Sequence, residues 1–330
     1  MKLGFSIILL TAIPLAMSPA QEILSSPFGF SKVTVAAAES EGQSRLTAIS
    51  ANFLREEKVS TLATLIDDYS DGYQSVVVSG ADWASNEFLA SPHLAYLTNA
   101  GGAEEAFLIT GHTTDGQLTI HCGYDLRGDS ETLETFGENV ELVIRQAHTI
   151  NSLFGSQVDE INRNDGFNLW SGKWVQYSYT GSMWVVAGDP FTDQGNTVIF
   201  PEEGLLIQRS QPTPLVFRFF GEVPTKVQTA TLDAAGLHLI SNRYPVSSTL
   251  AEQRIEQLAG WNSTQDSLYL WRNDSWKQFS HDGTAWRAAG NPFEDAGGTI
   301  IPPNSALFIS RATATPTNTR QIPDYLSSEQ

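Results

Sequence analysis

Apolar and polar residues alternate along most of the chain, and this period of two predicts β-strands. Gly, Asp and Asn separate the alternating segments, as is typical of turns between antiparallel strands. The clearest strand segments are residues 28–35, 73–80, 105–111, 116–123 and 139–146. The pattern predicts an all-β fold of mainly antiparallel sheets, arranged as a sandwich or in a barrel-like form, with a few short helices.

The predicted helices lie where apolar residues recur at helical spacing. One helix is expected just after residue 148, with Thr149 placed to cap it. A second is expected in residues 247–260, where Thr249 and Glu252 have the spacing of a capping box. The other segments with a helical pattern are residues 59–68 and 82–90.

One stretch of the sequence occurs twice. Residues 174–209 and 276–311 align without gaps at a constant offset of 102, and 17 of 36 positions are identical. The preceding segments extend the similarity to about residues 148–209 and 247–311. The shared residues are mainly Trp, Gly, Pro, Phe and alternating aliphatics, which set turns and fill cores. We interpret the pair as an internal tandem repeat whose copies bury a common face.

The chain begins with the features of a secretory signal peptide in residues 1–20. Lys2 is followed by a short apolar run, and Ser18 and Ala20 are the small residues expected before a cleavage site. No later apolar run is long enough to span a bilayer, so we expect no transmembrane segment after signal removal. This predicts a protein secreted to the extracellular space or the cell envelope. The remaining parts are an N-terminal β domain of residues 28–147, a β domain of residues 148–312 built of the two repeats, and a flexible tail of residues 313–330.

The net charge and the cysteine content limit which kinds of partner and cross-link the protein can have. The formal net charge is −18 at pH 7, and an acidic surface disfavours nucleic acid and anionic membranes, which need basic partners. The only cysteine, Cys122, has no intramolecular partner for a disulfide. We expect Cys122 to be a small buried residue, and its role stays open.

The search for catalytic motifs predicts a protein that is not an enzyme. The chain has no G-x-S-x-G elbow, phosphate-binding loop or dinucleotide fingerprint, and its six histidines form no metal-binding pair. Its many carboxylates leave a polysaccharide hydrolase open as an alternative, because that chemistry needs two carboxyl groups across a cleft.

Two sets of repeat residues are candidates for binding. Tryptophans exposed on a β-surface stack on sugar rings, although filling a core accounts for them as well. These candidates are Trp174, Trp184, Trp276 and Trp286. Oxygens in a glycine-rich loop bind Ca²⁺, although the same residues also form Asx turns. These candidates are Asp189, Asp193, Asn291 and Asp295. We favour a core role for the tryptophans and a turn role for the loop residues. We therefore expect no cofactor, and a bound Ca²⁺ ion is the alternative.

Several segments resemble a protein family. With "GFSKVTV", "FLITGHTTDGQLTI", "VIRQAHTINSLFG" and "GLHLISNRYPVSSTL", the chain resembles an uncharacterised family of secreted proteins of Verrucomicrobia and related bacteria. "GLHLISNRYP" and "IIPPNSALFISR" resemble modules of exported Bacteroidetes proteins that carry an Asn-Pro-Tyr-Pro turn, and Arg243 stands here in place of the first Pro. The resemblance implies an exported bacterial β-rich protein and supplies no catalytic residues.

These observations predict a non-catalytic protein with a structural, adhesive or assembly role in the cell envelope or outside the cell. A carbohydrate-binding protein and a polysaccharide hydrolase are the alternatives. The expected partners are glycans or other envelope proteins.

Overall fold

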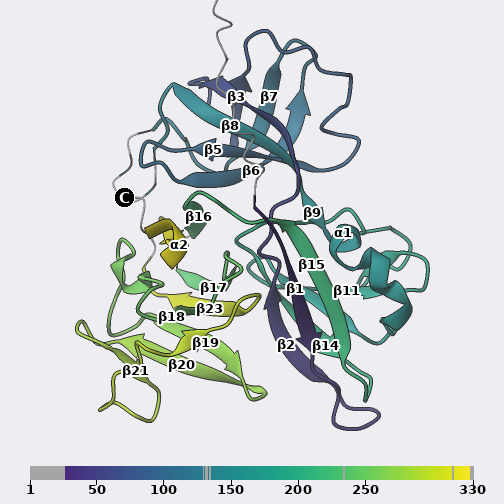
Figure 1. Cartoon of the computed structure of the whole chain (residues 1–330), viewed down its shortest axis with the longest axis vertical. Coiled ribbons are helices and arrows are strands. Elements are labelled where there is room, and N and C mark those ends of the chain that lie inside the picture. The colour runs from purple at the N-terminus through teal and green to yellow at the C-terminus, as the bar shows by residue number, and fades with distance from the viewer. Residues whose placement is uncertain are drawn as a thin grey trace, which may run out of the picture.

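The computed structural model describes residues 27–128, 130, 133, 135–232, 235–313 and 316–327, so the predicted signal peptide lies outside the described residues. Nearly all of the regular structure is β, as the sequence predicts (Figure 1). The helices are short: α1 (Ile150–Phe154), α2 (Asp324–Ser327) and the 3₁₀ helices η1 (Gly155–Glu160) and η2 (Ile255–Gln257). Within the described ranges, no helix is long and apolar enough to cross a membrane.

Six antiparallel strands form a barrel at the top of Figure 1. Their order is β6-β5-β8-β3-β4-β7, and β7 pairs back onto β6 to close the ring. The strands are β3 (Glu57–Leu65), β4 (Tyr73–Val77), β5 (His93–Thr98), β6 (Glu104–His112), β7 (Gln117–His121) and β8 (Asn139–Gln146). Alternate side chains, among them Leu97, Ile109, Leu118 and Leu142, fill the barrel interior.

Two five-stranded sheets follow, and they have the same strand order. The first is β12 (Trp184–Val186), β11 (Trp174–Tyr179), β10 (Gly166–Trp170), β14 (Gly204–Arg209) and β2 (Arg45–Ser50). The second is β21 (Trp286–Ala288), β20 (Ser275–His281), β19 (Ser267–Arg272), β23 (Ala306–Arg311) and β17 (Gly236–Ser241). Each sheet has a short pair beside it: β9 (His148–Thr149) with β13 (Val198–Ile199), and β18 (Ser248–Thr249) with β22 (Ile300–Ile301).

The two sheets pack against each other through strands β2 and β14 of the first and β17 and β23 of the second. Ala48, Leu206, Leu239 and Ala306 are buried in this contact. At Gly204 the backbones come so close that a Cβ would lie 2.4 Å from the Cβ of Ala306. A glycine is therefore required where the sheets approach most closely.

An antiparallel ribbon of β1 (Phe28–Val35) and β15 (Leu215–Glu222) covers the first sheet. Val33, Val35, Phe217 and Phe219 point inward and join the core of that sheet. The alternation of the two strands therefore places a second row of side chains on the outer face of the ribbon.

The structure corrects three of the helix predictions. Residues 59–68 form most of β3, and residues 82–90 form turns. In residues 247–260 the capping contacts do form, because Thr249 N donates to Glu252 Oε2 at 2.6 Å and Glu252 N donates to Thr249 Oγ1 at 3.3 Å. Arg254 then adopts a φ of 50°, which ends any helix, and only turns and η2 follow. The Thr149 cap is confirmed, since Thr149 accepts from Ser152 N.

The predicted domain boundaries also differ from the structure. Within the predicted N-terminal domain, β1 and β2 pair with strands beyond residue 200, so that domain does not begin at residue 28. Within the predicted flexible tail, β24 (Thr317–Gln321) is a buried strand paired with β16 (Gln228–Leu232), so that prediction is wrong there. Arg243, which is 1% exposed, fastens this pair by donating to Gln228 O at 2.8 Å and to Thr319 O at 3.3 Å.

Candidate functional site

Two of the four candidate tryptophans are core residues. Trp184 and Trp286 are 1% and 2% exposed, respectively. The Trp184 ring meets Phe167 at a centroid distance of 4.9 Å, and the Trp286 ring meets Trp261 at 5.9 Å. A sugar cannot stack on a ring that is covered on both faces, so the interpretation of these two as a binding platform is wrong.

The other two tryptophans lie at the contact between the two sheets. Trp174 and Trp276 meet Phe308 at centroid distances of 5.7 Å and 4.8 Å, and Trp170 meets Trp174 at 5.0 Å. Trp271 completes the group, which we call the aromatic seam, at 5.1 Å from Trp276. Trp174 is 41% exposed, so one ring of the seam is open to solvent.

The four candidate Ca²⁺ residues make turns with their own loops. Asp193 Oδ1 accepts from Gly195 N at 2.9 Å, and Asp295 Oδ1 accepts from Gly297 N at 2.8 Å. Asp189 Oδ1 accepts from Phe191 N at 3.2 Å, and a hydrogen bond from Thr192 is the main cause of the lowered pKa of Asp189. Asn291 Nδ2 donates to Glu294 Oε2 at 2.8 Å. In the part of the chain that the structure describes, no three His, Cys, Asp or Glu side chains gather as metal ligands would.

Both loops instead present a phenylalanine to solvent. Phe191 and Phe293 occupy matched positions in the two copies and are 88% and 91% exposed. The expectation that the shared phenylalanines fill a core is therefore wrong for this pair.

A cavity of about 630 Å³ lies between the end of β10 and strands β16 and β17, and two neighbouring carboxylates, Glu202 and Glu203, line it. Burial raises the pKa of Glu202 to about 8, with a further contribution from the charge of Glu203, and burial raises the pKa of Glu203 to about 7. Glu203 Oε2 accepts from Phe200 N at 2.9 Å, so this carboxylate closes its own turn. The two carboxylates lie side by side on one turn, whereas a glycosidase pair flanks its substrate from two sides.

A second cleft, of about 610 Å³, lies where the barrel meets the ribbon and α1, and we call it the cationic cleft. Its charged rim comes from Arg55, Lys58 and Arg218, with one acid, Glu56. Its apolar wall comes from Phe28, Leu153, Phe219 and Phe220.

The three cations of the cleft lack ion-pair partners in the part of the chain that the structure describes. No carboxylate among the described residues forms an ion pair with Arg55, Lys58 or Arg218. Lys32 lies directly opposite Arg218 across the ribbon, and like charges in that register destabilise a strand pair. In a chain of net charge −18, unpaired cations gathered at one place indicate a surface that attracts anions.

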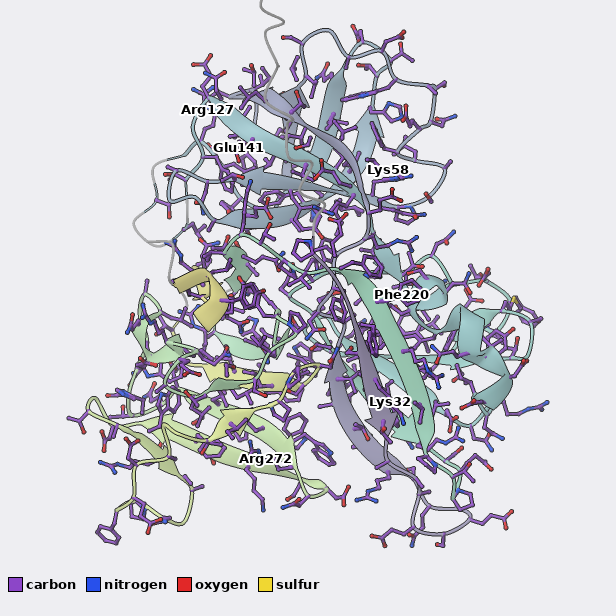
Figure 2. All side chains as sticks on the ribbon, in the orientation of Figure 1. Lys32, Lys58, Arg127, Glu141, Phe220 and Arg272 are labelled. Atoms are coloured by element: carbon purple, nitrogen blue, oxygen red, sulfur yellow. The ribbon has the colours of Figure 1, made fainter. Side chains whose placement is uncertain are left out.

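Large apolar side chains accompany these charges on the outer face of the ribbon. Phe28, Phe30 and Phe220 are 69%, 82% and 66% exposed, and the rings of Phe28 and Phe220 lie 6.4 Å apart. Figure 2 shows Lys58 on the barrel above Phe220, with Lys32 further along the ribbon. An exposed cluster of this kind is typical of a binding surface rather than of a solvated one.

Arg145, which does not itself line the cleft, links the segments that do. Its Nη1 donates to Arg55 O at 2.6 Å and pairs with Glu222, and its Nη2 lies 3.5 Å from Glu57 Oε2. Gly221 allows the ribbon to reach this point, since a Cβ there would lie 2.3 Å from Leu54 O. These contacts hold barrel and ribbon together and so preorganise the cleft.

His148 is a lining residue of the cleft, but its ring nitrogen Nδ1 is buried rather than open to the cleft. Its Nε2 lies 2.8 Å from Phe53 O and must donate to it, so Nδ1 carries the lone pair. Burial lowers the pKa of His148 to about 4, which keeps the ring neutral. Nδ1 has no hydrogen-bond partner among the described residues.

Sequence reasoning missed the cationic cleft because its residues come from four separate segments of the chain. A signal was present in residues 28–35 and 215–222, where Phe and basic residues occupy the positions that a half-buried strand gives to polar side chains. The positions of Arg55 and Lys58 relative to the ribbon depend on strand pairing over a long sequence separation.

The comparisons with known proteins add no relative. No protein-family model, no curated protein and no solved structure matches the chain. The resemblance to the secreted Verrucomicrobia family therefore stays a prediction.

Proposed function

We propose that this is a non-catalytic adhesive or assembly protein, acting outside the cell or in its envelope, that binds an acidic protein segment in the cationic cleft. The observation that carries the proposal is the group of three unpaired cations around an apolar wall in a strongly acidic chain. An aromatic or aliphatic side chain fits the apolar wall, and flanking carboxylates match the rim.

An acidic protein segment fits the cleft better than an acidic polysaccharide does. The exposed aromatic residues of the cleft are phenylalanines, Phe28 and Phe220, which offer a ring and no hydrogen-bonding group. Sugar sites combine a stacking ring with several polar groups that bind hydroxyls. Gln146 and Ser152 also line the cleft, but its wall of four apolar side chains favours an apolar side chain as the ligand.

Reversing the cleft charges is expected to abolish this binding. The probe is a fluorescein-labelled peptide of alternating Glu and Phe, and its affinity is measured by fluorescence anisotropy at low salt. The double variant Lys58→Glu and Arg218→Glu is expected to bind at least about tenfold more weakly, because attraction becomes repulsion at two exposed positions.

The matched control is Lys277→Glu, which reverses an exposed charge on β20, far from the cleft, and is expected to leave the affinity unchanged. Equal affinity of wild type and double variant contradicts the proposal. Tight binding of alginate with no binding of the peptide overturns the choice of a protein segment.

The aromatic seam supports carbohydrate binding as a second candidate function. Its supporting observation is Trp174, which is 41% exposed beside Trp170 and Phe308. Titration with cellohexaose or chitohexaose is expected to change the tryptophan fluorescence, and Trp174→Ala is expected to lose about 1–3 kcal/mol of binding free energy, the usual worth of a stacking ring. An unchanged fluorescence spectrum with both oligosaccharides counts against this candidate.

A further inference from the structure

The two matched loops each hold a phenylalanine ring almost fully in solvent. Phe293 is 91% exposed, and Pro292, Glu294 and Asp295 around it are also exposed. At this exposure almost the whole ring is accessible to a partner.

The sheet beneath holds the base of each loop in the same way, which favours a preorganised loop. Ala296 N donates to Trp286 O at 2.7 Å, and Thr299 N donates to Ala296 O at 2.9 Å. Gln194 N donates to Trp184 O at 2.7 Å in the first copy. A side chain presented on a preorganised loop loses little conformational entropy on binding, which suits it to be an anchor.

The second loop has the chemistry that complements the cationic cleft. Glu294 directly follows Phe293, so a carboxylate adjoins the ring, and Asp295 is the next residue. The first loop carries its second acid at Asp189 and has Thr192 at the position of Glu294, so no carboxylate directly follows its phenylalanine and it is the poorer match. The cleft, at about 610 Å³, is within the range of ligand pockets and has room for a ring and its neighbours.

We propose that the loop of residues 291–295 of one copy of this chain docks into the cationic cleft of a second copy, with Phe293 against the apolar wall and Glu294 beside Arg218 and Lys58. This rests on the proposed function and names the acidic segment as part of the protein itself. The charges are complementary, and exposed apolar surface is covered on both sides.

The placement of loop and cleft determines the kind of assembly. β21, from which the loop extends, lies on the opposite side of the molecule from β15 and α1, which line the cleft (Figure 1). A chain therefore does not fill its own cleft with this loop. Contacts between different patches are heterologous, so copies join head to tail into a ring or a filament.

Sedimentation velocity of the purified chain over a range of concentrations tests the proposal. Wild type is expected to associate reversibly at 50 mM salt and to dissociate as salt screens the charges. Phe293→Ala is expected to weaken association at least about tenfold, which matches the loss of a buried aromatic anchor. Phe191→Ala, the equivalent substitution in the first loop, is the matched control and is expected to associate as wild type does.

A charge swap separates a direct contact from a general loss of stability. Arg218→Glu and Glu294→Arg are each expected to associate weakly alone, whereas the double variant that carries both substitutions is expected to recover association, because each reversed cleft then meets a reversed loop. Wild type that stays monomeric at all concentrations overturns the inference, and so does equal weakening by Phe191→Ala and Phe293→Ala, or a double variant that fails to recover association. If the Glu-Phe peptide still binds the cleft in that case, only this inference fails and the proposed function stands.

Discussion

Asp165→Ala is expected to lower the free energy of unfolding by about 3–5 kcal/mol, the usual cost of breaking a buried ion pair. Asp165 is 0% exposed and pairs with Arg209, which is 4% exposed, at 2.5 Å. The same carboxylate accepts from Asn162 N at 2.9 Å and from Ser210 N at 2.8 Å. Its removal leaves a buried guanidinium without its counter-charge and two backbone donors without an acceptor.

Urea unfolding followed by tryptophan fluorescence measures this loss. Asp67→Ala replaces an exposed aspartate and is expected to stay within about 0.5 kcal/mol of wild type. A change below about 1 kcal/mol for Asp165→Ala contradicts the prediction.

Asp266→Ala provides the corresponding test in the second sheet. Asp266 is 1% exposed and accepts from Asn262 N at 2.8 Å and from Ala312 N at 2.7 Å, close to the position of Asp165 in the first sheet. It is also expected to destabilise the protein. The aspartate directly before the central strand of each sheet, β10 or β19, therefore has a structural role in both sheets.

Raising the pH through the range in which Glu202 and Glu203 ionise is expected to destabilise the fold. Burial is the main cause that raises the pKa of Glu202 from its ordinary 4.5 to about 8 and that of Glu203 to about 7. The folded chain thus retains protons that the unfolded chain releases near pH 4.5. The stabilising contribution is complete below that pH and is lost as the pH rises through 7 and 8.

The expected loss in the free energy of unfolding between pH 6.5 and 9 is about 1–3 kcal/mol. One pKa unit corresponds to about 1.4 kcal/mol, and the partial exposure of both side chains reduces the full effect. Burial lowers the pKa of His148 to about 4, so this side chain makes the stability rise with pH in the range below 6.5. Measurement above pH 6.5 avoids its contribution. Glu202→Gln is expected to remove most of this dependence of the free energy of unfolding on pH. Glu41→Gln, at an exposed position, is expected to leave the dependence unchanged. If the dependence of the free energy of unfolding on pH is the same in Glu202→Gln as in wild type, the prediction is contradicted.

The residues that the two copies share have divided roles. The tryptophans Trp184 and Trp286 are buried, as a core interpretation requires, and each anchors a loop. The phenylalanines Phe191 and Phe293, equally well matched in the sequence, are almost fully exposed. Identity between the copies therefore marks the structural frame and the exposed rings, whereas the binding that we infer for Phe293 depends on Glu294, a position at which the copies differ.

The local pattern of apolar and polar residues was sufficient to predict most of the strands and the all-β class. This is because alternation with a period of two reflects which face of a strand is buried. It failed for β3, where Leu62 faces solvent at 70% exposure and blurs the alternation, so that Ala and Leu suggested a helix. It also failed for β24, which has almost no apolar residues and is held by pairing with β16 and by Arg243.

The sequence by itself determined the β-rich class, the two similar stretches, the Thr149 cap and the acidic charge of this protein. These follow from local periodicity and composition, which act within a few residues. Only the tertiary structure decided which tryptophans are covered and which phenylalanines are exposed. It also decided that Arg55, Lys58 and Arg218 meet around one cleft. Strand pairing over long separations brings such residues together, and no short stretch of sequence contains that information.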